Sequence, residues 1–281
     1  MINRIKRSIK EFLRGDIPRT DHKPIVNKTF GVSDLKSIDI IFLVTVGRSG
    51  TKSFIDYLQK YSELNAYHAP KPCLATLGSL IWDSEVDEKC AQWCYFSARE
   101  KYLIDSYKKN IPFVDGDCKN LPLLPSLSEF FPRSKFLHIT RNPVSFIVSG
   151  LNRGYFKNKD PVFWGHLKLN NRHSWALNFE EQVEMIADFW EIGNTLAKET
   201  RDLVGEERFI TLRAEDFLSD SRYIDDALSV MGIDIANKNS GVLPRLNKNK
   251  KSQQFDREFI MDKVKERCPS AKNLYPELFD L

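Results

Sequence analysis

The residues best suited to chemistry lie together in one short turn, Gly47–Ser53, whose sequence is GRSGTKS. An apolar run at Ile38–Val46 precedes this turn, and an amphipathic stretch at Thr51–Tyr61 follows it. Glycines let the main chain approach a ligand closely, and the N–H groups at the start of a helix favour an anion. Arg48 and Lys52 add positive charge. The pattern predicts a phosphate-binding loop; the alternative is a glycine turn that only joins a strand to a helix.

The loop differs from the motif that binds nucleoside triphosphates. That motif, GxxxxGK followed by Ser or Thr, would require glycine at positions 46 and 51 if Lys52 and Ser53 were its last two residues. Position 46 is valine and position 51 is threonine. No apolar strand that ends in a magnesium-binding aspartate follows at a convincing distance. We therefore expect a phosphate cradle of another kind.

A second cationic group follows another predicted strand, Lys135–Thr140. Arg141 comes directly after this strand, Pro143 is suited to the first position of a helix, and Ser149 lies eight residues beyond Arg141. Two helical turns would bring the Ser149 hydroxyl and the Arg141 guanidinium onto one phosphate. A surface ion pair is the common alternative for an arginine at a strand end. Ligands of open α/β sheets collect at the carboxyl ends of the strands, so we expect one ligand with two separated phosphates to bridge both groups.

Strand-like and helix-like segments alternate along the chain. Apolar segments predict strands at 64–68, 111–114, 135–140 and 208–212, and helical periodicity is clearest at 179–204. The alternation predicts an α/β fold of three layers, with a central, mostly parallel sheet flanked by helices. We expect residues 1–35 to form an N-terminal extension and linker, and residues 36–281 to form a single domain. Residues 150–178 predict an irregular excursion that covers a substrate.

Together, GRSGTKS and the strand followed by Arg-Asn-Pro and a serine resemble the two donor-binding motifs of the sulfotransferase superfamily. Its members use 3′-phosphoadenosine 5′-phosphosulfate (PAPS). The likeness covers roughly residues 38–255 and is nearer to the bacterial and carbohydrate branches than to the cytosolic aryl enzymes. The resemblance implies a P-loop-type fold and transfer of a sulfuryl group from PAPS to a hydroxyl of a small molecule or glycan. It implies no metal ion, because fixed cations compensate the charge.

The resemblance also implies roles for individual residues. Arg48 and Lys52 would contact the phosphosulfate oxygens during catalysis, and Arg141 and Ser149 would hold the 3′-phosphate that distinguishes PAPS from ATP. The residues that would cradle the 5′-phosphosulfate are Arg48, Ser49, Gly50, Thr51, Lys52 and Ser53.

Two further cations are weaker candidates for the nucleotide site. Arg213 ends a predicted strand, and Lys248 lies in the basic loop RLNKNKK. Arg213 would otherwise pair with Glu215 or Asp216, and the basic loop would otherwise be solvated.

The acceptor hydroxyl needs a general base, and the candidate is His68, just after the second predicted strand. An imidazole can accept a proton near neutral pH. Related enzymes often carry a glutamate here in a His-Glu-Pro arrangement, whereas this chain has Ala69. The alternatives are Asp115 or Asp117 as the base, with His68 in a structural role.

Composition narrows the choice of partners and compartment. The net charge of +4 does not demand a nucleic-acid partner, and no apolar run approaches the roughly 18 residues that span a bilayer. Five cysteines at irregular spacing indicate reduced thiols in the cytoplasm. The basic segment 1–20 carries apolar residues at helical spacing, which indicates either peripheral membrane contact or docking on protein. The oligomeric state stays open.

Two rival functions share the predicted fold. A P-loop kinase or other phosphotransferase would need a magnesium-binding carboxylate and a longer phosphate cradle. A non-catalytic nucleotide-binding scaffold would explain Ala69 as a sign of lost activity.

Overall fold

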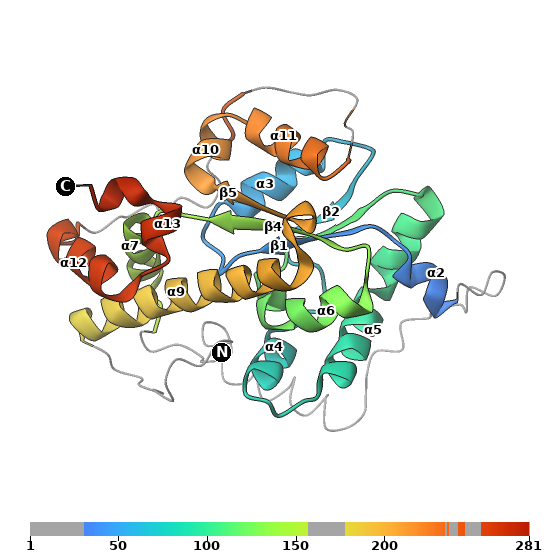
Figure 1. The fold of residues 1–281 in the computed structure, drawn as a ribbon, viewed down its shortest axis with the longest axis horizontal. Coiled ribbons are helices and arrows are strands. Elements are labelled where there is room, and N and C mark those ends of the chain that lie inside the picture. Colours follow the sequence, from blue (N-terminus) through green and yellow to red (C-terminus); the bar gives the residue numbers. More distant parts are fainter. Residues whose placement is uncertain (1–30, 157–177, 234, 236–240, 245–253, 281) are drawn as a thin grey trace, which may run out of the picture. The chain divides into compact units, whose positions relative to one another are not determined.

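A five-stranded parallel sheet forms the centre of the fold (Figure 1). The computed structural model describes residues 31–156, 178–233, 235, 241–244 and 254–280. Its helices and strands belong to the compact unit Ser33–Leu281, apart from Val32, the first residue of helix α2 (Val32–Lys36). The strands are β1 (Ile40–Val44), β2 (Asn65–Tyr67), β3 (Phe113–Asp115), β4 (Lys135–Thr140) and β5 (Phe209–Arg213). They lie in the order β2-β3-β1-β4-β5, and each neighbouring pair is parallel.

Helices cover both faces of this sheet (Figure 1). One face carries α3 (Thr51–Leu58), α10 (Ala214–Ser219) and α11 (Arg222–Val230). The other face carries α5 (Glu88–Lys109), α6 (Leu124–Phe130) and the long α9 (Phe179–Val204). The other described helices are α2 (Val32–Lys36), α4 (Ala75–Trp82), α7 (Pro143–Arg153), α12 (Arg257–Arg267), α13 (Ala271–Leu274) and the 3₁₀ turns η1 (Cys118–Leu123), η2 (Glu206–Arg208) and η3 (Pro276–Leu278). The predicted three-layer α/β fold is confirmed.

The central strand β1 is buried on both faces, as its unbroken apolar sequence predicts. Ile41 and Leu43 belong to the apolar cluster that α3, α10 and α11 share. On the opposite face the ring of Phe42 lies 5.5 Å from that of Phe136 and 5.7 Å from that of Tyr95. Because apolar contacts hold both faces, the carboxyl end of β1 has a fixed position from which the following loop begins.

The order of the strands places a topological switch point beside β1. This strand lies between β3 and β4, with Val44 in register with His138 of β4. The connections that leave β1 and β4 lead to α3 and α7, respectively. Ligands of open α/β sheets bind at such a point, outside the carboxyl ends of the strands.

Local signals set the starts of two functional helices. Pro143 is the first residue of α7, and the Asn142 side chain accepts a hydrogen bond from the Ser145 N–H at 3.1 Å. A capping box of Asn178 and Glu181 begins α9, which has the predicted bounds.

The irregular excursion predicted from residue 150 begins too early. Helix α7 continues to Arg153, and Gly154 ends it with a left-handed φ of 65°. Residues 157–177 of that excursion lie outside the described residues.

The helices and the cysteines can also be compared with the predictions from composition. No helix in the described part of the chain is both long enough and apolar enough to cross a bilayer. Each of the five cysteines is a free thiol.

Candidate active site

The loop between β1 and α3 has the backbone of an anion cradle. Gly47, Arg48 and Gly50 all have left-handed φ angles, of 84°, 57° and 82°. The hydroxyl groups of Thr45 and Ser49 are 2.6 Å apart, and the Thr45 hydroxyl also accepts the Gly47 N–H at 3.2 Å. Buried hydroxyls therefore hold the loop from within. Glycine is the residue that takes a left-handed conformation without steric cost.

The start of α3 is open to an anion. Gly50 caps the helix and offers no side-chain acceptor to the N–H groups of its first turn. The Ser53 hydroxyl donates to the Pro244 carbonyl at 2.7 Å, so this hydroxyl is already engaged within the protein. Unpaired N–H groups and the positive end of the helix dipole favour a phosphate.

The loop and α7 meet through Arg48, Arg141 and Ser149. The Arg48 Nε donates to the Ser149 hydroxyl at 3.2 Å, and the Arg141 Nη1 donates to the Arg48 carbonyl at 2.7 Å. The strand-end arginine and the serine eight residues later therefore both contact the first motif. The structure brings the two predicted cationic groups together at the switch point.

Arg48 is half-buried in a positively charged environment. Burial lowers its pKa from the ordinary value, the charge of Arg153 lowers it further, and Tyr155 acts in the opposite direction. No carboxylate in the described part of the chain forms an ion pair with Arg48. A partly desolvated guanidinium beside a second cation is stabilised by a bound anion.

Lys52 and His68 both lie at the first turn of α3. Lys52 is exposed, and none of the described residues gives it an ion pair or hydrogen bond. The Thr51 hydroxyl and the His68 Nε2 are 3.5 Å apart. Desolvation lowers the pKa of His68, with Asp56 raising it and Lys52 lowering it. The imidazole is therefore neutral, and able to accept a proton, at pH 7.

The alternative bases are held in a buried ionic network. Arg99 donates to Asp115 at 2.8 Å and to Asp117 at 3.1 Å, and Tyr95 donates to Asp115 at 2.9 Å. Asp115 is 0% exposed and Asp117 is 2% exposed. Because both carboxylates are buried and paired with Arg99, they are poorly placed to accept a proton from a ligand.

Of the two weaker candidates for the nucleotide site, Arg213 and Lys248, the structure describes only Arg213. Arg213 forms an ion pair with Glu277 and lies 4.3 Å from the centre of the Tyr275 ring. The predicted alternative partners, Glu215 and Asp216, are thus replaced by the C-terminal segment, which a local sequence pattern cannot reveal. Lys248 lies outside the described residues.

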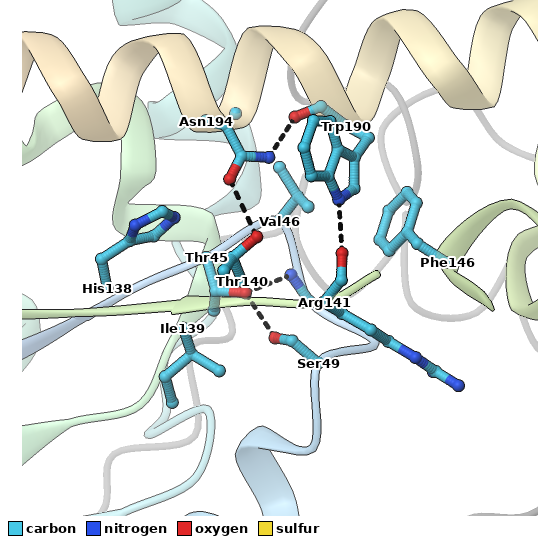
Figure 2. Close-up of a pocket in the computed structure, with 12 residues that line it drawn as sticks. Thr45, Val46, Ser49, His138, Ile139, Thr140, Arg141, Phe146, Trp190 and Asn194 are labelled. Atoms are coloured by element: carbon cyan, nitrogen blue, oxygen red, sulfur yellow. Dashed lines mark hydrogen bonds between the residues drawn. The ribbon is translucent and has the colours of Figure 1, made fainter. Parts of the chain in front are cut away.

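Sequence reasoning missed the residues beneath the loop. A small pocket with room for about one water molecule lies there (Figure 2). Its polar lining comes from the loop after β1, from β4 and from α9, and includes Thr45, His138, Thr140 and Asn194. Trp190 of α9 also lines the pocket. In the sequence, these residues could have been recognised as polar residues at the end of an otherwise apolar strand and on the apolar face of α9.

No group of three or more potential metal-ligating side chains occurs among the described residues.

Comparison with solved structures relates this fold to sulfotransferases. A sulfotransferase from Alicyclobacillus acidocaldarius aligns with a TM-score of 0.52 and 16% identity, over 83% of this chain and 94% of its own. The sulfotransferase domain of the curacin biosynthetic pathway aligns with a TM-score of 0.46 and 15% identity, over 79% of both chains. That of a Synechococcus olefin synthase aligns with a TM-score of 0.44 and 14% identity, over 87% of this chain and 86% of its own. No family profile matches the chain, and no curated protein does. The first of these structures confirms the predicted resemblance at the level of the fold.

Proposed function

We propose that this protein is a sulfotransferase that moves a sulfuryl group from PAPS to a hydroxyl group. One observation carries the proposal: Arg48 and Ser149, 101 positions apart, are hydrogen bonded, and Arg141 is bonded to the Arg48 carbonyl. Two cationic elements that are far apart in the sequence thus meet at one place. PAPS carries phosphate on both the 3′ and the 5′ position of its ribose and can occupy both elements at once. The fold shared with a sulfotransferase supports the same reaction.

The residues present fit this anionic donor. The glycine-bearing loop and the start of α3 would hold the 5′-phosphate through main-chain N–H groups. Arg141 and Ser149 would hold the 3′-phosphate, with the forked donor geometry that suits a guanidinium to phosphate. PAPS supplies an activated sulfuryl group, so the protein's task is positioning and charge compensation.

Lys52 and Arg48 would stabilise the charge that develops during transfer. As the acceptor oxygen bonds to sulfur and the sulfur–oxygen bond to the 5′-phosphate breaks, negative charge collects on the former bridging oxygen. By analogy with phosphoryl transfer, fixed cations beside that oxygen lower the barrier. Lys52 is exposed and without a partner among the described residues, so its ammonium group is available for this role.

His68 would take the proton from the acceptor hydroxyl. Its lowered pKa keeps the imidazole neutral at pH 7, and its Nε2 lies 3.5 Å from the hydroxyl of Thr51 in the first turn of α3. Base and cradle would therefore lie beside the same helix start.

We further propose a carbohydrate or glycoconjugate as the acceptor, in a cytoplasmic protein whose residues 36–281 form the catalytic domain. The likeness of both motifs to carbohydrate sulfotransferases supports the acceptor class. The five free cysteines support a reducing compartment. The basic residues and helical spacing of segment 1–20 support contact with a membrane surface.

A thermal-shift panel with adenosine 3′,5′-bisphosphate, ADP and ATP, each with and without magnesium, tests the donor. We expect the bisphosphate to raise the melting temperature without magnesium, because ligand bound to the native state stabilises it. Stabilisation by ATP with magnesium, and none by the bisphosphate, would identify a kinase instead.

Transfer from labelled PAPS to a panel of hydroxyl acceptors tests catalysis. We expect label on at least one glycan acceptor. Binding of the bisphosphate without transfer to any acceptor would favour the scaffold.

A further inference from the structure

A side chain of helix α9 is hydrogen bonded to Arg141, the residue predicted to bind the 3′-phosphate. The Trp190 Nε1 donates to the Arg141 carbonyl at 2.8 Å, and Figure 2 shows the indole pointing from α9 toward this carbonyl. Trp190 is 1% exposed. A buried indole N–H needs a hydrogen-bond partner, and here that partner is the first residue beyond β4.

Asn194, one helical turn further along α9, holds the neighbouring residue of β4. Its amide oxygen accepts from the Thr140 hydroxyl at 3.1 Å, and its amide nitrogen donates to the Trp190 carbonyl at 2.7 Å. Thr140 and Asn194 are 2% and 6% exposed. Two successive residues at the end of β4 are therefore bonded to side chains of one helix face.

The same hydrogen bonds extend to the loop. The Arg141 guanidinium donates to the Arg48 carbonyl, so the series Trp190–Arg141–Arg48 connects α9 to the phosphate-binding loop. A hydrogen bond can fix the Arg141 main chain only if its donor is itself immobile, and burial in α9 makes the indole so. The separation of the two cationic elements thus depends on α9.

We propose that Trp190 and Asn194 are positioning residues that hold Arg141 at the distance from the loop that a 3′,5′-bisphosphate requires. This inference rests on the proposed function. Its distinguishing consequence is that the loss of either residue weakens a ligand that needs both elements, and spares a ligand that needs the loop alone.

The test compares two ligands by calorimetry, adenosine 3′,5′-bisphosphate and adenosine 5′-monophosphate. Trp190→Phe keeps an aromatic ring and removes the N–H donor. We expect this change to weaken the bisphosphate about 10-fold, the usual effect of losing a buried hydrogen bond, with the monophosphate unchanged. Asn194→Leu, which keeps the approximate shape of the side chain, should act in the same direction and gives a second variant if Trp190→Phe does not fold.

Phe189→Leu supplies the matched control. Phe189 is a buried aromatic residue of the same helix that packs against Phe146, with ring centres 6.3 Å apart. We expect this variant to lower the melting temperature without changing the ratio of the two affinities. In steady-state assays Trp190→Phe should raise the KM for PAPS and leave kcat unchanged at saturating donor.

The outcomes separate the inference from the proposed function. If Trp190→Phe and Asn194→Leu weaken both ligands equally, or neither, the two residues are structural only and the inference is overturned. If the unaltered protein binds the bisphosphate no more tightly than the monophosphate, the proposed function itself fails.

Discussion

The two cations of the loop, Lys52 and Arg48, differ in exposure, and we expect different roles for them. Lys52 is exposed and lacks a partner among the described residues, whereas Arg48 is half-buried and bonded to Ser149. Lys52 can therefore follow the developing charge, and Arg48 also fixes the geometry of the loop. Replacing the first should affect chemistry, and replacing the second should affect both chemistry and binding.

Lys52→Ala should lower turnover about 10²–10³-fold, the effect of removing one group that stabilises charge in a transition state. The melting temperature should not change, because the side chain is exposed and makes no ion pair with the described residues. Initial rates with labelled PAPS measure the effect. Lys60→Ala, also exposed and just beyond the end of α3, is the control. Full activity in Lys52→Ala would remove this lysine from the mechanism.

We predict that His68, as the proposed general base, makes activity depend on pH. A general base must be neutral, so kcat/KM should fall as pH drops through the pKa of His68, which desolvation places below its ordinary value of about 6.5. His68→Gln should lower the rate and abolish this acid limb. A pH–rate profile from pH 4.5 to 8 gives the comparison. An unchanged limb in the variant would assign the titration to another group.

His138 should make stability, rather than activity, depend on pH. Burial lowers the pKa of His138 to about 4, whereas in the unfolded chain it is about 6.5. The unfolded state therefore binds the proton first, and stability falls as pH drops from about 6.5 toward 4, by at most about 3 kcal/mol. Urea unfolding at pH 7 and pH 4.5 measures the loss. His138→Gln should reduce it, and an equal loss in the variant would contradict the assignment.

Residue spacing predicted part of the site and concealed the rest. Arg48, Arg141 and Ser149 were identified because each follows a predicted strand or helix start, and parallel strands end at one edge of the sheet. Trp190 and Asn194 act across a gap of about 50 residues to β4. No periodicity reveals which turn of a helix faces which strand end, because packing decides it.

At the scale of elements, the apolar sequence pattern predicted that strand β1 exists but not where it ends. The run Ile38–Val46 predicted a longer strand than β1, which ends at Val44. Thr45 belongs to the loop, where its hydroxyl group is hydrogen bonded to the Ser49 hydroxyl and accepts the Gly47 N–H. An apolar run locates a buried strand, but the hydrogen bonds of the following turn determine where the strand ends.

Close packing of α9 against the loop leads to a prediction at the scale of elements. A methyl group at position 193 would lie 1.9 Å from the Cγ1 of Val46, so only glycine fits there. Gly193→Ala should lower the free energy of unfolding by about 1–3 kcal/mol, the usual cost of overpacking, and should raise the KM for PAPS by displacing the loop. Chemical denaturation and donor kinetics measure both effects.

A second substitution identifies the clash. Val46→Ala removes the Cγ1 atom, so the double variant Gly193→Ala with Val46→Ala should recover most of the stability and the KM. If the two changes are simply additive, the loss does not come from this contact.

At the scale of the whole molecule, the sequence predicted the class of fold but not its strand order. Alternating strands and helices required a parallel sheet, yet they did not indicate that β1 lies between β3 and β4. That placement creates the switch point and brings Arg48 and Arg141 into contact. The role of the C-terminal segment was equally hidden, since Glu277 meets Arg213 only after the chain has folded.

Arg213 is the last residue of β5 and Arg141 follows the neighbouring strand β4, but the complete fold gives the two arginines different surroundings. Because Arg213 is paired with Glu277, Arg213→Gln should weaken adenosine 3′,5′-bisphosphate less than Arg141→Gln does. Calorimetric titration of both variants tests this order. The reverse order would place Arg213 on the nucleotide.

A single nucleotide that bridges the two cationic elements is the premise of the proposed function. A crystal structure of the complex with adenosine 3′,5′-bisphosphate tests this directly. We predict the 5′-phosphate on the N–H groups of residues 47–53 and the 3′-phosphate on the side chains of Arg141 and Ser149. A bisphosphate that leaves either element empty, or that binds elsewhere on the protein, would contradict the account.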